Sequence, residues 1–193
     1  MKIVGLIPSI IERRNSNYLM IDYKLISFIS KCFPRHQIKI LTRAEKIRLD
    51  YIISIGSNSL LTVKNTKSNK IRKIFDDYYF RYSLKKNIPF LGICYGAQFI
   101  AKFFKSKIVK KENHTRKNHK IFFNRSDITQ NVNSYHDYSI IKLGKKLNVI
   151  AYTKDGSIEA FRHETNKILG IMWHPERYSK IRKFDINFIK KFL

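Results

Sequence analysis

The sequence predicts an α/β fold: a mostly parallel central sheet with helices on both faces, plus a small antiparallel strand region in the C-terminal half. Two observations lead to this prediction. In the first half, short apolar runs alternate with longer segments whose apolar residues recur at helical spacing. In the second half, short strand-like runs follow one another, separated by turn residues such as Asp155-Gly156.

The first half alternates strand and helix. Proline marks the helix ends, because Pro34 follows the first helical pattern and Pro89 stops the second. Glycine closes the third strand at Gly56. The expected strands are 2–7, 36–41, 51–56 and 89–94, and the expected helices are 18–33, 69–87 and 96–104.

The second half changes to short strands and one closing helix. We expect strands over 120–124, 132–136, 148–154, 158–163 and 167–173, and a helix over 185–193. The chain shows no internal repeat, low-complexity segment or linker. A chain of 193 residues is long enough to bury a real core, so we expect a single domain over 1–193.

Composition limits the class of protein. The 44% hydrophobic and 27% charged fractions are those of a globular chain. Cys32 and Cys94 lie far apart and form neither a disulfide framework nor a C-x-x-C pair. No apolar run approaches the roughly 20 residues of a membrane helix, and the N-terminal run is too short for a signal peptide. We therefore expect a cytoplasmic protein without a membrane partner.

The net charge of +25 is the most unusual compositional feature. It could indicate a polyanion partner such as nucleic acid, a nucleotide or an acidic membrane surface. It could equally reflect the Lys, Ile and Asn bias of an A/T-rich genome, because the lysines are spread along the chain without a basic block. We expect no nucleic-acid partner, although such a field attracts anionic small substrates.

Cys94 stands on a predicted strand-to-helix turn, in the segment Gly92-Ile-Cys-Tyr-Gly96. This G-x-C-x-G pattern matches the nucleophile elbow G-x-S-x-G with sulfur in place of oxygen. A helix N-terminus favours the thiolate, and the N–H of Tyr95 can stabilise an oxyanion. A buried structural cysteine is the alternative interpretation, since the motif is short.

A second segment supplies a base for this nucleophile. His174 ends an apolar run, and Glu176 follows two residues later. Pro175 favours an extended backbone at His174, so both side chains are expected on the same side. Glu176 could then orient the imidazole while its other nitrogen faces the thiol of Cys94.

Together, "PFLGICYGAQ" and "GIMWHPER" resemble the class I glutamine amidotransferase superfamily, whose fold is flavodoxin-like. Its members cleave a γ-glutamyl amide through a cysteine thioester. The resemblance implies that Cys94 is the nucleophile, His174 the general base and acid, and Glu176 the orienting group. It also implies an oxyanion hole of backbone N–H groups from Tyr95 and from the loop at Gly56-Ser57, where the family more often has two glycines.

Three other segments, "HTRKNH", "VNSYHDYSI" and "DGSIEAFRHE", resemble the γ-glutamyl hydrolase (peptidase C26-like) branch. Within it the chain looks most like members that split a γ-glutamyl nucleotide phosphoramide in capsule biosynthesis. That branch carries an R-D-x-x-E stretch. Here Arg72 matches outright and Asp76 is a shorter acid, which leaves the role of the stretch open. The resemblance implies that the glutamyl group is bound, largely by backbone, at Asn133, Ser134, Tyr135 and His136. Gln98, one helical turn past Cys94, could also reach this group.

His114 and His119 raise the question of a metal site. Two histidines without a nearby carboxylate or thiol are a weak ligand set, so we expect no metal and no cofactor. The predicted function is a cysteine-dependent amidohydrolase that releases glutamate from a small γ-glutamyl substrate. Two alternatives stay open. One is a glutaminase subunit that supplies ammonia to a partner synthase, and the other is a basic nucleic-acid-binding protein on an inactive scaffold.

Overall fold

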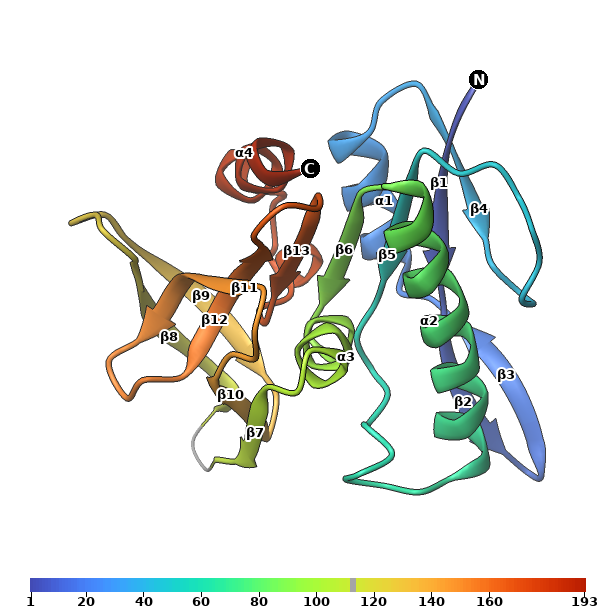
Figure 1. The fold of residues 1–193 in the computed structure, drawn as a ribbon, viewed down its shortest axis with the longest axis horizontal. Helices are drawn as coiled ribbons and strands as arrows, with labels where there is room; N and C mark the ends of the chain where they lie inside the picture. The colour runs from blue at the N-terminus through green and yellow to red at the C-terminus, as the bar shows by residue number, and fades with distance from the viewer. Residues whose placement is uncertain (112–113) are drawn as a thin grey trace.

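The computed structural model describes residues 1–111 and 114–193. Within these ranges one mixed sheet has the strand order β4-β1-β5-β6-β13-β12-β11-β8-β9, with β10 pairing to β12 and β7 (Figure 1). Neighbours from β4 to β13 pair in parallel, and those from β13 to β9 are antiparallel. The predicted fold class is confirmed. The parallel strands are β4 (His36–Ile40), β1 (Lys2–Ile7), β5 (Tyr51–Ser54), β6 (Phe90–Ile93) and β13 (Ile168–Ile171).

The antiparallel region is larger than expected. Its members include two strands that the sequence analysis missed, β7 and β10, and two that it shortened, β8 and β9. The missed strands are short, and the shortened ones begin with polar runs, 115–120 and 129–131, that give no apolar pattern. The strands of the antiparallel region are β7 (Lys107–Lys110), β8 (Thr115–Phe123), β9 (Thr129–Tyr135), β10 (Tyr138–Lys142), β11 (Leu147–Thr153) and β12 (Ile158–His163).

Two helices pack on each face of the parallel strands (Figure 1). The helices α1 (Tyr23–Cys32) and α4 (Lys183–Phe192) cover one face, while α2 (Lys67–Lys86) and α3 (Tyr95–Phe103) cover the other. Each pair closes its own apolar core, one around Trp173 and one around Phe80. No helix in the described ranges is long and apolar enough to cross a membrane.

The predicted helix over 18–33 begins too early. Residues before Tyr23 belong to a hairpin of β2 (Ser9–Arg13) and β3 (Ser16–Met20), whose two turn residues Arg14 and Asn15 both have positive φ. Such turns favour Asn and Gly, and Arg-Asn is a weak signal for one. The helix starts where the side chain of Asp22 accepts a hydrogen bond from the N–H of Lys24 at 2.9 Å.

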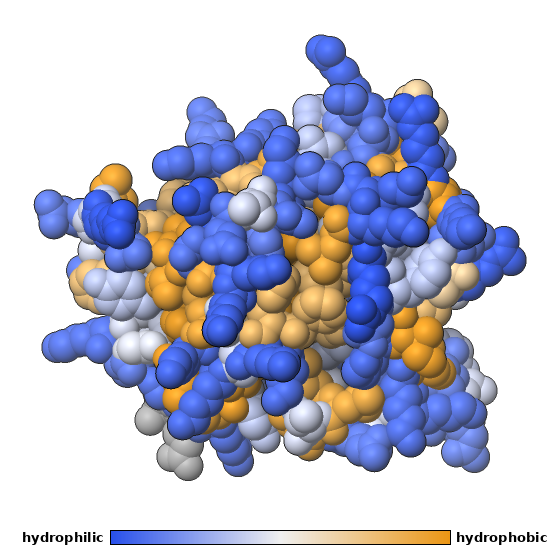
Figure 2. Space-filling view, viewed as in Figure 1, coloured by the Kyte–Doolittle hydropathy of each residue, from blue (hydrophilic) through white to orange (hydrophobic). Residues whose placement is uncertain are grey.

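Hydrophilic side chains cover most of the face in Figure 2, with apolar side chains in view near its centre. The carboxyl ends of β1, β5 and β6 lie next to one another in the parallel part of the sheet. Loops at this edge are where an open α/β sheet builds its binding site.

Candidate active site

Cys94 lies at the junction of β6 and α3, where it is the N-terminal cap residue of the helix with φ 51° and ψ −102°. The turn is tight because a Cβ on Gly96 would lie 2.2 Å from the carbonyl oxygen of Ser54, and one on Gly92 would lie 2.5 Å from the backbone of Gly96. Only glycine fits at these two positions. Cys94 is held in a left-handed conformation that costs energy for a residue with a side chain.

His174 and Glu176 come to this turn from the end of β13 and from the 3-10 turn η1 (Pro175–Arg177). His174 Nδ1 lies 2.6 Å from Glu176 Oε1. Nε2, the other ring nitrogen, is therefore the one left free for the thiol of Cys94, which lies with His174 beside Gly56. His174 is 2% exposed and Glu176 5% exposed, so water screens this chain of contacts very little.

Electrostatics favour an ion pair between the thiol and the imidazole. Burial raises the pKa of the Cys94 thiol, but the charge and hydrogen bond of His174 outweigh it, and the net pKa lies below its ordinary value. Burial lowers the pKa of His174, whereas Cys94 and Glu176 raise it, to about 9 on balance. These directions are typical of an activated cysteine nucleophile.

Asn133 holds the backbone of His174 on both sides. Its Nδ2 donates to the His174 carbonyl at 2.8 Å, and its Oδ1 accepts from the His174 N–H at 2.8 Å. The N–H of Asn133 in turn donates to the hydroxyl of Tyr178 at 2.9 Å. The side chain and the N–H of Asn133 are thus both engaged within the protein, rather than left for substrate.

The loop after β5 lies beside both Cys94 and His174. A Cβ on Gly56 would lie 2.7 Å from His174 Cε1 and 3.4 Å from Cys94 Cβ. The hydroxyl of Ser9 donates to the Gly56 carbonyl at 2.6 Å. In a trans peptide the next N–H, that of Ser57, points the opposite way. Ser57 adopts φ 81°, the region that glycine prefers, so the side chain has not displaced the loop from that conformation.

Arg72 and Asp76 support this loop from below. Both side chains are fully buried, and Arg72 Nε lies 2.8 Å from Asp76 Oδ2. Arg72 also donates to the carbonyls of Pro8 and Ile55, at 2.7 and 2.9 Å. The guanidinium stacks over the Tyr95 ring, 4.8 Å from its centroid. The stretch that resembles R-D-x-x-E therefore fastens α2 to the ends of β1 and β5.

A pocket of about 390 Å³ opens at Cys94 and His174. Gln98, Tyr135 and His136, three of the expected substrate-binding residues, line it, and the amide of Gln98 donates to the carbonyl of Tyr138 at 2.9 Å. Ser134 does not line the pocket. Its side chain is buried, and its hydroxyl donates to the carbonyl of His114.

Two cations that the sequence analysis did not single out, Lys64 and Arg177, also line the pocket. Arg177 lies over the Tyr135 ring at 4.5 Å and is the last residue of the "WHPER" segment, which was the available signal for it. Lys64 had no signal in the sequence. The described lining therefore carries these two cations against one carboxylate, that of Asp137.

Comparison with known proteins identifies the family of this chain. The family model of glutamine amidotransferase class-I matches residues 75–193. This chain belongs to the class-I glutamine amidotransferase family. It is 38% identical over 135 residues, 70% of the chain, to a γ-glutamyl-CDP-amidate hydrolase of Campylobacter jejuni. That match covers 66% of the relative's length. A GMP synthase of Ehrlichia ruminantium is 32% identical over 154 residues, 74% of the chain and 28% of the synthase.

Solved structures agree on the fold. The structure of a GMP synthase subunit from Thermoplasma acidophilum superposes with a TM-score of 0.73 over 100% of this chain and 92% of its own, at 18% identity. A glutamine amidotransferase from Thermotoga maritima gives 0.67 over 98% and 83%, at 16% identity. Both likenesses support the fold described above.

Proposed function

We propose that this protein hydrolyses a γ-glutamyl amide and releases glutamate, with Cys94 as nucleophile. The observation that carries the proposal is the meeting of Cys94 and His174 at one pocket, with Glu176 2.6 Å from the imidazole. Membership of the class-I glutamine amidotransferase family supports the same chemistry.

The reaction runs in two halves. The Cys94 thiolate attacks the γ-carbonyl carbon, a C–S bond forms, and the oxyanion is stabilised by the N–H groups of Ser57 and Tyr95. The intermediate collapses as His174 gives its Nε2 proton to the leaving nitrogen, which breaks the C–N bond. Water then attacks the thioester while His174 accepts its proton, the C–S bond breaks, glutamate is released and the Cys94 thiolate is regenerated.

For the leaving group we propose a nucleotide phosphoramide. The similarity to a γ-glutamyl-CDP-amidate hydrolase supports this choice. The cations Lys64 and Arg177 at the rim of the pocket and the net charge of +25 also favour a leaving group that carries phosphates. Under this proposal the protein acts in the phosphoramidate decoration of a capsular polysaccharide.

The test is glutamate release from a panel of γ-glutamyl amides that includes glutamine and γ-glutamyl-CDP-amidate. We expect the wild-type protein and Cys32→Ala to turn over the nucleotide phosphoramide, and Cys94→Ala to fold and release no glutamate. Cys32 is the matched control because it is the other buried free thiol. Turnover by Cys94→Ala would refute the mechanism, and glutamine as the preferred substrate would refute the leaving group.

The second candidate is a glutaminase subunit that delivers ammonia to a synthase, which the similarity to GMP synthases favours. It uses the same three residues. Glutamine hydrolysis that appears only when a partner protein is added would support this candidate over the hydrolase.

A further inference from the structure

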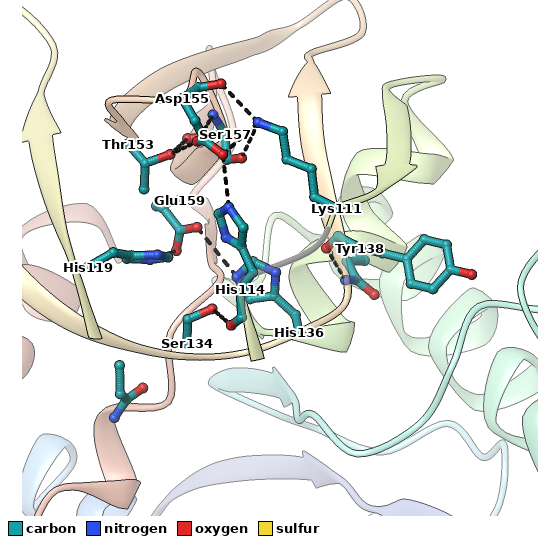
Figure 3. Close-up of polar contacts among 12 residues, drawn as sticks. Lys111, His114, His119, Ser134, His136, Tyr138, Thr153, Asp155, Ser157 and Glu159 are labelled. Atoms are coloured by element: carbon teal, nitrogen blue, oxygen red, sulfur yellow. Dashed lines mark hydrogen bonds and ion pairs between the residues drawn. The ribbon is translucent and has the colours of Figure 1, made fainter. Parts of the chain in front are cut away.

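Three histidines and one glutamate meet behind the wall of the pocket (Figure 3). His114 precedes β8, His119 lies on β8, His136 follows β9, and Glu159 lies on β12. His114, His136 and Glu159 are 5%, 4% and 0% exposed. One ligand atom from each of these three residues lies within 4.8 Å of the other two.

Most polar atoms in this cluster lack hydrogen bonds. Among the described residues no partner is found for Nδ1 of His114, Nε2 of His119, either ring nitrogen of His136, or either carboxylate oxygen of Glu159. Leaving a carboxylate buried without donors is costly, and native proteins rarely do it. The atoms are nevertheless close: His119 Nε2 lies 3.4 Å from Glu159 Oε2, and His136 Nε2 lies 3.4 Å from Glu159 Oε1.

These separations fit a shared ion better than hydrogen bonds. Hydrogen bonds between nitrogen and oxygen span about 2.7–3.2 Å. Two ligand atoms bound at about 2.0–2.1 Å to one tetrahedral ion stand roughly 3.4 Å apart. The two pairs that include Glu159 have this separation, each to a different carboxylate oxygen, and their atoms are not aligned for hydrogen bonding to each other.

The far side of His114 has the support that a metal-bound imidazole usually has. Its Nε2 lies 2.9 Å from Asp155 Oδ2, and Asp155 accepts hydrogen bonds from Lys111 Nζ at 2.7 Å and from the Ser157 N–H at 3.1 Å. A carboxylate at Nε2 keeps the proton there, so the Nδ1 lone pair faces the cluster. The backbone of His114 is held as well, because its carbonyl accepts from the Ser134 hydroxyl (Figure 3).

We propose that His114, His136 and Glu159 bind one divalent transition-metal ion of the zinc class. His119 lies beside this group, with its Nε2 3.4 Å from Glu159 Oε2, and would have to shift to supply a fourth ligand. Imidazole and carboxylate are ligands that such an ion takes in proteins, although its structural sites more often use cysteine. The ion would join the β8–β9 hairpin to β12 and fix His136, which lines the pocket beside Cys94. The expectation of no metal depended on a missing carboxylate, and Glu159 is that carboxylate, brought in by the fold.

Without an ion, the same residues would have to form a buried ion-pair cluster. Burial lowers the pKa of His136 but Glu159 raises it, and the balance lies above the ordinary value. A protonated His136 beside the Glu159 carboxylate is therefore the competing account. It predicts that the protein binds no metal tightly.

The experiment measures metal in the purified full-length protein and then binding of Co²⁺ and Zn²⁺ to protein stripped with a chelator. We expect close to one ion per chain and, with Co²⁺, the strong visible absorption of a tetrahedral site. If the absorption does not appear when Co²⁺ is added to stripped wild-type protein, the proposal is overturned without any variant. Glu159→Gln is expected to weaken Zn²⁺ binding by about 100-fold, with folding checked by circular dichroism.

Two further variants fix the ligand set. His36→Asn is the matched control. Like His136, His36 has two buried ring nitrogens without partners among the described residues. It lies on β4, however, and packs between Phe33 and Tyr51 instead of beside Glu159. It should keep full metal content. Cys94→Ala should also keep it, so metal is measured independently of amide hydrolysis. Loss of the ion in Cys94→Ala, or equal affinity in Glu159→Gln and wild type, would overturn the assignment.

Discussion

Asp76→Asn is expected to destabilise the protein strongly, whereas Asp77→Asn is not. The two carboxylates sit one residue apart on α2, and each pairs with a cation four residues earlier. The side chains of Arg72 and Asp76 are both 0% exposed, while those of Lys73 and Asp77 are 48% and 31% exposed. The two substitutions therefore make the same chemical change in two environments.

The magnitudes follow from burial. Removing one partner of a buried pair leaves an uncompensated charge and costs about 3–5 kcal/mol, whereas an exposed i,i+4 pair contributes about 0.3–0.5 kcal/mol. At roughly 2–4 °C per kcal/mol for a chain of this size, Asp76→Asn should lower Tm by roughly 6–20 °C. Asp77→Asn should lower it by less than about 2 °C.

The assay is thermal and urea unfolding of both variants beside wild type. Glutamate release is measured on the same samples, because Arg72 also donates a hydrogen bond to the carbonyl of Ile55, at the start of the loop after β5 that is proposed to stabilise the oxyanion. Asp76→Asn should lose activity even at temperatures where it stays folded. Equal unfolding midpoints for the two variants would refute the argument from burial.

Three other predictions concern the site. Iodoacetamide at pH 7 should alkylate Cys94 much faster than Cys32. The pKa of Cys94 lies below the ordinary thiol value of 9.0, whereas burial raises the pKa of Cys32 to about 12. Peptide mapping measures the labelling, and equal labelling of the two thiols would contradict the prediction. Asn133→Ala should lower kcat with little change in KM, since it frees both backbone groups of His174; a rise in KM alone would assign it to substrate binding instead. Ser9→Ala should lower kcat by up to about 10²-fold, less than the loss of a whole oxyanion donor, and unchanged kcat would show that the loop keeps its orientation without Ser9.

The pH dependence of kcat/KM follows from the same pair. Activity requires the Cys94 thiolate and the protonated His174 together. The rate should rise as the thiol, whose pKa is lowered, loses its proton, and should fall as pH passes about 9 and His174 loses its own. Glu176→Gln removes a group that raises the pKa of His174, so the upper limb should move to lower pH. A profile unchanged in Glu176→Gln would contradict the role of that carboxylate.

The sequence alone determined the parallel half of the fold and the site that depends on it. Strand and helix periodicities there are local, and prolines and glycines mark their ends. The residues proposed for catalysis also lie in two short segments of the sequence. The turn at Cys94 needs glycines on either side, and the spacing of His174 and Glu176 is set by the one proline between them. Such features depend on neighbours in the chain.

Only the tertiary structure decided how distant segments meet. The role of Asn133 could not be read from the sequence, because its partner His174 reaches it across the sheet. The same holds for Ser9, whose hydroxyl bonds to the loop after β5, and for Glu159, which completes the histidine cluster from a strand that is not adjacent in sequence. Hydrogen bonds and ligand sets between distant residues depend on sheet order and register, and these are settled by packing rather than by local pattern.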